Sequence, residues 1–185
     1  MRSRDTVLLF SIAGGFLACL LLWNSLWPAG AEAKVRILPG TTPEADEQTV
    51  TEILGLFEQA EEAIKGRDID TMMTVYSKSY DYHGLTKSEM RHIWESLFAN
   101  HRDLSTSHIF TRINLTRREP TFIVEVTCTG SLYARSDITG QKTAIDSWYE
   151  EVHYLVKEDG KWRIRGNAGE RAHALQFGTA PHPLF

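Results

Sequence analysis

The chain is poor in cysteine, with Cys19 and Cys128 as the two among its 185 residues. Cys19 lies within an apolar N-terminal run, so the rest of the chain holds one thiol and cannot form an internal disulfide. This excludes a disulfide-stabilised scaffold and any metal site built from several cysteines. Cys128 occurs in an alternating, strand-like pattern, which favours a small buried apolar side chain over a nucleophile.

Clusters of basic residues are also absent. The formal net charge is −4, and because the charges of the first 33 residues cancel, the remainder of the chain carries the same −4. Arg117-Arg118 is the one basic doublet in that remainder, and Glu119 follows it directly. The chain therefore lacks the electrostatic footprint of a nucleic-acid-binding protein, and we expect no nucleic-acid partner.

The sequence lacks the motifs of metal, nucleotide and triad chemistry. Among the seven histidines, His92 and His101 fall about half a turn out of phase on one expected helix, so they do not converge on a metal ion. The Gly14-Gly15 pair lies in the apolar run rather than in a phosphate-binding loop. No serine has the context of a nucleophile elbow. We therefore predict no metal and no cofactor.

One long apolar run is present. Residues 7–27 contain no charged side chain, and this length at about 1.5 Å per residue crosses a hydrocarbon core of about 30 Å. Arg2 and Arg4 precede the run, and Trp23 and Trp27 lie at its far end, where a membrane interface favours indole rings. The pattern predicts a transmembrane anchor at 7–27 in a bacterial inner membrane, with residues 1–6 cytoplasmic and the rest periplasmic.

Two other fates of this segment stay open. Ala31-Glu32-Ala33 has the small-x-small form of a signal-peptide cleavage site, which would make the mature protein secreted. A lipoprotein signal ending at Cys19 fits less well, because Leu17 is bulky where that signal has a small residue. In each case the following domain is exported, and residues 28–45, rich in Pro, Gly and Ala, are expected to form a tether.

Helical periodicity begins at residue 46. Apolar residues at helical spacing predict a first helix that ends at Gly66, and Asp68 is placed to cap a second, shorter helix. A third helix has Thr86 and Glu89 at the spacing of a capping box. After residue 104 the apolar period changes to two, which predicts four long antiparallel strands ending in the hairpin "KEDGKW". Helices followed by strands indicate an α+β domain at 46–168, and residues 169–185 form an irregular tail.

This order of elements resembles the nuclear transport factor 2-like superfamily, and within it the bacterial SnoaL-like and calcium/calmodulin-kinase-association-like branch. The most recognisable pieces are "GRDIDTMMTVYSKSYDYHG" and "EDGKWRI". The resemblance implies a cone-shaped, curved antiparallel sheet that wraps around three N-terminal helices and leaves a pocket. Members include isomerases, dehydratases, epoxide hydrolases and cyclases, along with proteins that bind ligands or assemble, so the fold does not specify a function.

Catalytic members of this superfamily place a carboxylate in an apolar pocket, where burial raises its pKa toward that of a general base. In the last long strand, Asp146, Trp148, Glu150 and Tyr154 alternate onto one face, and the aromatic residues suggest that this face is the inward one. Glu150, or Asp146 nearer the rim, is then the candidate base. The alternative is that Glu150 reaches solvent or pairs with an arginine.

The short segment before the third helix is expected to lie near the pocket mouth. Alternation allows Tyr80 and Tyr82 to face inward, or Asp81 and His83, but not all four. We expect the tyrosines to face inward, because a buried Asp–His pair needs further partners. The candidate pocket residues are therefore Tyr80, Tyr82, Trp94, Trp148 and Tyr154.

Two functions remain open at this stage. One is a binding or assembly domain that holds a small apolar ligand or forms a homodimer through the open face of its sheet, with Phe110, Tyr149 and His153 on that outer side. The other is an enzyme of isomerase, cyclase or dehydratase type that uses Glu150 or Asp146 as the base and a pocket tyrosine as hydrogen-bond donor.

Overall fold

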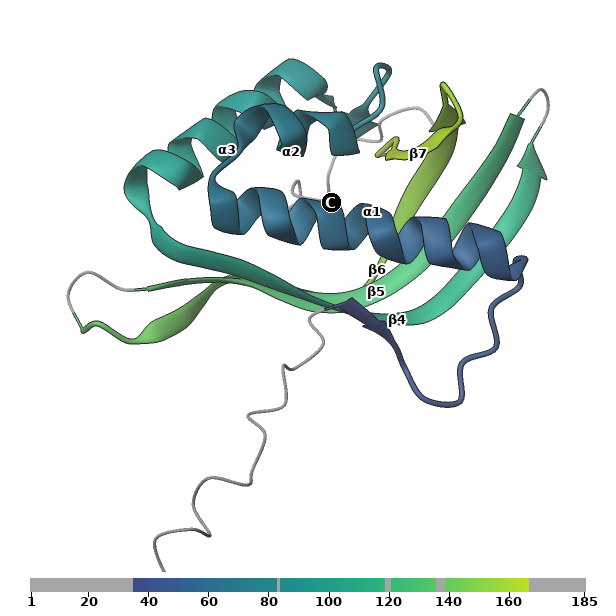
Figure 1. Ribbon diagram of the computed structural model, residues 1–185, viewed down its shortest axis with the longest axis horizontal. Helices are drawn as coiled ribbons and strands as arrows, with labels where there is room; N and C mark the ends of the chain where they lie inside the picture. The colour runs from purple at the N-terminus through teal and green to yellow at the C-terminus, as the bar shows by residue number, and fades with distance from the viewer. Residues whose placement is uncertain (1–34, 83, 119–120, 136–138, 167–185) are drawn as a thin grey trace, which may run out of the picture. The chain divides into compact units, whose positions relative to one another are not determined.

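The computed structural model describes residues 35–82, 84–118, 121–135 and 139–166. The predicted membrane anchor at 7–27, the tail at 169–185 and His83 lie outside these ranges. No helix within them has both the length and the apolar character required to cross a membrane. The described part is an α+β domain in which three helices pack on a curved sheet (Figure 1).

The helices begin where the sequence predicts. They are α1 (Glu47–Gly66), α2 (Ile69–Val75) and α3 (Lys87–Asn100). Asp46 caps α1, since its carboxylate accepts hydrogen bonds from the backbone N–H and the hydroxyl of Thr49 at 2.8 and 2.7 Å. Asp68 caps α2 in the same way. The capping box of Thr86 and Glu89 at the start of α3 is confirmed.

A five-stranded sheet has the order β1-β4-β5-β6-β7. Its strands are β1 (Val35–Ile37), β4 (Arg102–Arg118), β5 (Thr121–Arg135), β6 (Lys142–Glu158) and β7 (Lys161–Ile164). The last four are antiparallel, as predicted, whereas β1 pairs in parallel with β4. The expected tether at 28–45 therefore contributes an edge strand, and Glu44 also bridges to β4. A separate small hairpin joins β2 (Asp81–Tyr82) and β3 (Leu85–Thr86).

The core lies between α1 and the concave face of the sheet, where α1 crosses the strands (Figure 1). Ile53, Phe57, Ala60 and Ile64 of α1 are fully buried there, and burial of each large apolar side chain contributes about 1.5–3 kcal/mol. Glu61 is also buried, and its carboxylate accepts hydrogen bonds from the backbone N–H and the hydroxyl of Thr106, both at 2.6 Å. This carboxylate joins α1 to the start of β4.

Two of the register shifts in the sheet decide which side chains of the candidate site face the core. In β6, Tyr149 and Glu150 together stand opposite Thr129 of β5, because Trp148 pairs with Gly130 and Glu151 with Cys128. The backbone of Glu150 has a φ of 51°. A second register shift lies between Phe110 and Arg112 in β4. An extra residue in one strand reverses the alternation beyond it, so positions that a regular strand would turn outward face inward.

Candidate functional site

The bulge in β6 overturns the expected position of the candidate base. Glu150 is exposed, and its backbone N–H donates to the hydroxyl of Thr129 at 3.1 Å. The prediction that Glu150 faces the interior is therefore wrong, because the regular alternation on which it rests stops at Tyr149. Asp146 is partly exposed, and its carboxylate accepts from the backbone N–H of Ser147 at 2.8 Å.

Glu151 takes the inward position instead. The phenol of Tyr82, from β2, donates a hydrogen bond to the Glu151 carboxylate at 2.8 Å. Tyr82 is buried and Glu151 is half-buried, so the pair lies at the edge of the core between the small hairpin and β6. Sequence reasoning missed Glu151 because no glycine or proline marks the bulge that precedes it.

The aromatic candidates divide between the core and the outer face. Tyr80, Tyr82, Trp94 and Trp148 are buried. The Trp94 indole donates to the phenol of Tyr76 at 2.7 Å, and burial raises the pKa of both Tyr76 and Tyr80 far above the ordinary tyrosine value. These tyrosines stay neutral.

Tyr154 differs from the prediction. It pairs with Glu125 across β5 and β6, on the face of the sheet opposite the core, and it is half-buried. Its assignment to the pocket is wrong for the same reason as that of Glu150, since both follow from uninterrupted alternation.

The centre of the concave face combines a thiol with imidazole and aromatic rings. Cys128 is fully buried, and its sulfur lies 3.4 Å from the Trp148 indole nitrogen and 3.5 Å from Nδ1 of His108. Burial raises the pKa of the thiol to about 12, so Cys128 is not a nucleophile at neutral pH. The Phe57 ring packs edge-on against His108, with 4.9 Å between ring centroids.

Two residues expected on the outer side belong to this inner cluster. Phe110 and His153 are buried, and their ring centroids lie 4.8 and 6.2 Å from that of Phe57. Their assignment to the outer face is therefore wrong. Tyr149 alone of the three predicted outer residues is exposed, with 78% of its surface accessible.

The outer face of β4, β5 and β6 is mostly uncharged. Its side chains lie opposite the buried ones along each strand. They are Ile109, Thr111, Arg112, Asn114 and Thr116 of β4, Glu125, Thr127, Thr129 and Ser131 of β5, and Ser147, Tyr149, Glu150, Val152 and Tyr154 of β6. We call this set the outer face. Its charged members are Arg112, Glu125 and Glu150, and the others are hydroxyl, amide, aliphatic or aromatic side chains.

The charges of the outer face are of both signs. Arg112 is 4.0 Å from the carboxylate of Glu44 and pairs with Thr127 of β5. Glu125 lies two residues before Thr127, opposite Asn114 and Tyr154, so Arg112 and Glu125 are diagonal neighbours on adjacent strands. Glu150 lies where β6 is the edge of the sheet, because β7 pairs with β6 from Leu155 to Glu158. The charged members therefore do not form a cluster of one sign.

Metal ligands do not converge in the part of the chain that the structure describes. Within it, no group of three or more His, Cys, Asp and Glu side chains is arranged to hold a metal ion.

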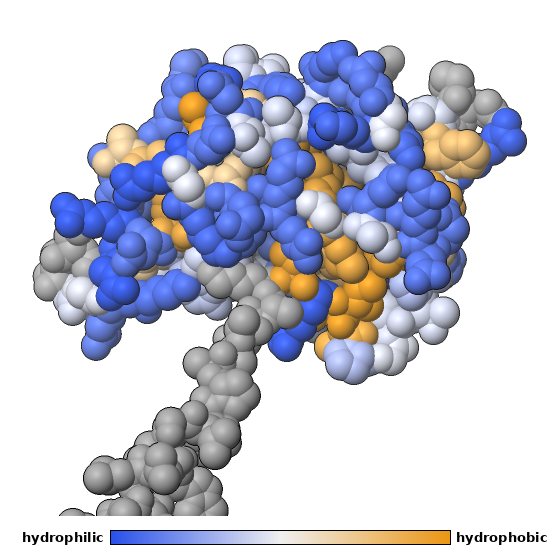
Figure 2. Space-filling view, in the orientation of Figure 1, coloured by the Kyte–Doolittle hydropathy of each residue, from blue (hydrophilic) through white to orange (hydrophobic). Residues whose placement is uncertain are grey.

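The helical layer presents mostly polar side chains to solvent, while apolar side chains are visible between α1 and the sheet (Figure 2).

Comparison with known proteins identifies relatives of the fold. No family model and no curated protein matches the chain. The solved structure of Aln2 from a Streptomyces species is 12% identical over 65% of this chain and 88% of its own, with a TM-score of 0.52. A conserved protein from Planctomyces limnophilus gives the same identity and TM-score over 65% of this chain and 93% of its own. A Streptomyces avermitilis protein of the NTF2-like family is 11% identical, with a TM-score of 0.45, over 65% of this chain and 94% of its own.

Proposed function

Because the chain carries a domain with the fold of the nuclear transport factor 2-like superfamily, we propose that it is an assembly domain that forms a homodimer through the outer face of its sheet. Members of this superfamily often dimerise through that face. The observation that supports the proposal is the composition of the outer face defined above, in which hydroxyl, aliphatic and aromatic side chains predominate.

The outer face has the composition of an interface rather than of a solvated sheet face. Its members span about eight residues of each of β4, β5 and β6, and at about 3.3 Å per residue and about 4.8 Å between strands they present about 400 Å². A standard protein interface buries about 800 Å² per partner, so this face supplies about half of that area, and the centre of such an interface is depleted of charge. A sheet face that stays in solvent is instead predominantly polar and charged.

A single substitution tests this assembly. Thr127 lies near the middle of the outer face, half-buried and paired with Arg112 on one side and Val152 on the other. Thr127→Arg leaves the monomer folded, because the long side chain can reach water, but in a dimer it buries a second positive charge beside Arg112. We expect the solution mass, measured by light scattering on the full chain in non-ionic detergent, to fall from dimer to monomer.

The matched control adds the same charge elsewhere. Thr143 of β6 is exposed and pairs with the core residue Ala134, so it points to the other face. Thr143→Arg is expected to remain dimeric. A wild-type chain that is monomeric at all concentrations, or two variants with equal mass, would count against the proposal.

A second candidate function rests on the Tyr82–Glu151 pair. A half-buried carboxylate that accepts a phenol hydrogen bond has the components of a general base in an isomerase or dehydratase. In a dehydration, Glu151 would remove the proton next to a carbonyl, the C=C bond would form as hydroxide leaves from the β-carbon, and the Glu151 carboxyl would return its proton to the hydroxide to give water. With 4-hydroxy-4-phenylbutan-2-one as probe, this function predicts enone absorbance that Glu151→Gln abolishes and Glu150→Gln leaves unchanged. Absence of turnover, or equal loss in both variants, would reject it.

The small apolar ligand and the membrane location remain part of the proposal. A ligand inside the domain would be recovered by mass spectrometry after denaturation of the purified chain. Anchoring through residues 7–27 predicts that the protein isolated from membranes retains Met1, whereas cleavage after Ala33 would release a chain that begins at Lys34. N-terminal sequencing distinguishes these outcomes.

A further inference from the structure

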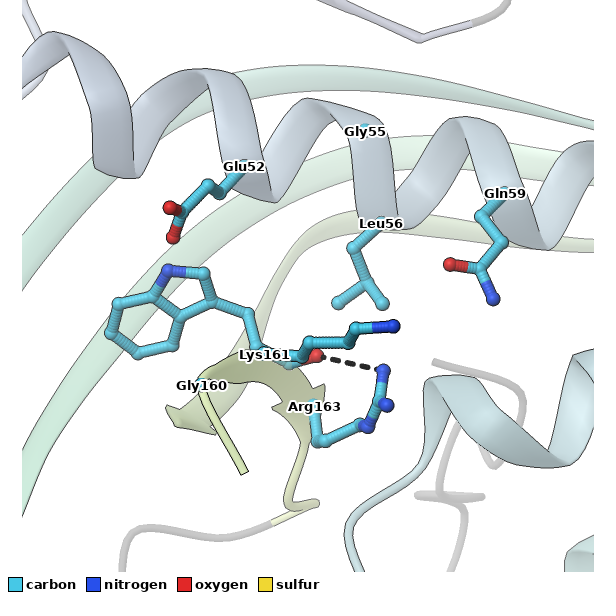
Figure 3. A pocket seen from close by; sticks show the side chains of 8 residues that line it. Glu52, Gly55, Leu56, Gln59, Gly160, Lys161 and Arg163 are labelled. Carbon is cyan, nitrogen blue, oxygen red and sulfur yellow. Dashed lines mark hydrogen bonds between the residues drawn. The ribbon is translucent and has the colours of Figure 1, made fainter. Parts of the chain in front are cut away.

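A groove of about 270 Å³ lies between α1 and the β6–β7 hairpin, and neither Tyr82 nor Glu151 belongs to its lining. Leu56 of α1 and Trp162 of β7 contribute apolar surface to it, and both are 95% buried. Figure 3 shows the Lys161 and Arg163 side chains extending in the same direction, toward the space beside Leu56 and Gln59. The volume has room for about nine groups of the size of water.

The charge of the groove is positive although the chain as a whole is negative, at −4. Lys161 and Arg163 form no ion pair with any carboxylate in the part of the chain that the structure describes. Glu52 is the one acidic residue in the lining, and it is already engaged. Its carboxylate accepts from Lys157 and from Gln48, both at 2.9 Å, and these hydrogen bonds lower its pKa.

Other charged side chains surround the groove. Lys78 and Lys87 repel Arg163, whereas Asp159 attracts it. Asp159 is paired with Lys78 at 2.8 Å. Glu158 accepts hydrogen bonds from the Ser77 hydroxyl at 2.6 Å and the Lys78 backbone N–H at 3.0 Å. The nearby carboxylates therefore have partners. Arg163 donates a hydrogen bond from Nη1 to the carbonyl of Trp162 at 3.3 Å (Figure 3), and its other N–H groups and the Lys161 ammonium form no ion pair within the described residues.

A glycine in the middle of α1 provides an independent indication. Gly55 lies in the groove lining, inside a helix of 20 residues, where glycine is less stable than alanine. A Cβ atom added at Gly55 would meet no atom from outside its own stretch of helix within 4 Å, so packing against the rest of the domain does not require glycine here. Its effect is to leave the wall of the groove open beside Leu56.

We propose that this groove binds a small organic anion, a carboxylate or a phosphate monoester with a short apolar body. Lys161 and Arg163 hold the charged end through charge-assisted hydrogen bonds. Leu56 and Trp162 receive the apolar body, and the absent side chain at Gly55 leaves room for it. None of the residues that line the groove belongs to the proposed dimer face, so the failure of either proposal leaves the other standing.

The test is titration calorimetry of the full chain in non-ionic detergent with three probes, which are phenyl phosphate, benzoate and inorganic phosphate. We expect saturable binding of phenyl phosphate or benzoate at least ten-fold tighter than that of inorganic phosphate. The double variant Lys161→Gln, Arg163→Gln is expected to weaken binding at least ten-fold. Lys142→Gln with Arg117→Gln removes the same charge from exposed positions in β6 and β4 and is expected to leave binding unchanged.

A second variant separates occlusion of the groove from loss of folding. Gly55→Leu leaves both cations in place, improves helix propensity and fills the groove. We expect its melting temperature to equal or exceed that of the wild type while phenyl phosphate binding is lost. Unchanged binding in both groove variants, equal affinity for phenyl phosphate and inorganic phosphate, or no saturable binding of any probe would overturn the proposal.

Discussion

Residues 150 and 151 are neighbours in β6, yet the bulge predicts that substitutions at them have different effects. Glu151→Ala removes the acceptor of the Tyr82 phenol, whereas Glu150→Ala removes an exposed carboxylate at a position whose backbone conformation alanine can keep. Uninterrupted alternation along the strand would predict the reverse order. The pair of variants therefore tests which of the two side chains faces the core.

The size of the expected coupling free energy follows from the hydrogen bond between Tyr82 and Glu151. Its length is 2.8 Å, its acceptor is a carboxylate, and it is partly buried, so we expect a coupling free energy of about 1–2 kcal/mol between Tyr82 and Glu151. Glu150→Ala is expected to change the free energy of unfolding by less than about 0.5 kcal/mol, as is usual for an exposed side chain. No coupling is expected between Glu150 and Tyr82.

The assay is a double-mutant cycle in urea with Tyr82→Phe, Glu151→Ala and the double variant, repeated with Glu150→Ala. With a urea dependence of about 2 kcal/mol per molar, the expected coupling corresponds to about 0.5–1 M in the unfolding midpoint. Coupling of Tyr82 to Glu150 and not to Glu151 would show that the inward side chain is misassigned. Equal and near-zero couplings at both positions would also contradict the assignment.

Other predictions concern packing, the thiol and pH. Gly130→Ala would bring a Cβ atom into overlap with a carbonyl oxygen of β4 and to 2.5 Å from the Trp148 ring. The free energy of unfolding in urea should therefore fall by about 3 kcal/mol. A variant as stable as the wild type would contradict this packing. In a Cys19→Ser background, Cys128 should react with a thiol reagent at pH 8 on unfolding and not before, because burial raises its pKa to about 12. Hydrogen bonds from the first turn of α1 lower the pKa of Asp46 below the ordinary 3.8. The ionised Asp46 therefore contributes its full stabilisation above pH 3.8, and this stabilisation is lost as the pH falls below that value. Asp46→Asn should then flatten the decline of the melting temperature below about pH 4. An unchanged decline would contradict this prediction.

The helices and their caps could be predicted because their signals are local. Asp46 and Asp68 lie one residue before α1 and α2, and the capping box of α3 follows from the spacing of Thr86 and Glu89. Each signal depends on hydrogen bonds within one turn of helix. β1 was not predictable in this way, since a strand of three residues within a segment rich in Pro and Gly has no pattern of its own.

The candidate site was predicted in part. The burial of Tyr80 and Tyr82 follows from simple alternation, because no bulge interrupts their short segment. The positions of Glu150, Tyr154 and Phe110 were wrong, because a bulge reverses alternation and is set by pairing with a neighbouring strand. Glu150 has a positive φ without being glycine, so no residue type in the sequence marks the position.

In the proposed assembly, the outer face of the sheet joins two copies of this chain. The most direct measurement is the solution mass of the full chain by light scattering, with the detergent contribution subtracted, across a range of concentrations and in parallel with Thr127→Arg. We expect twice the chain mass of 21.0 kDa for the wild type and a single chain mass for the variant. A wild type of 21.0 kDa throughout, or a dimer that Thr127→Arg leaves intact, would contradict it.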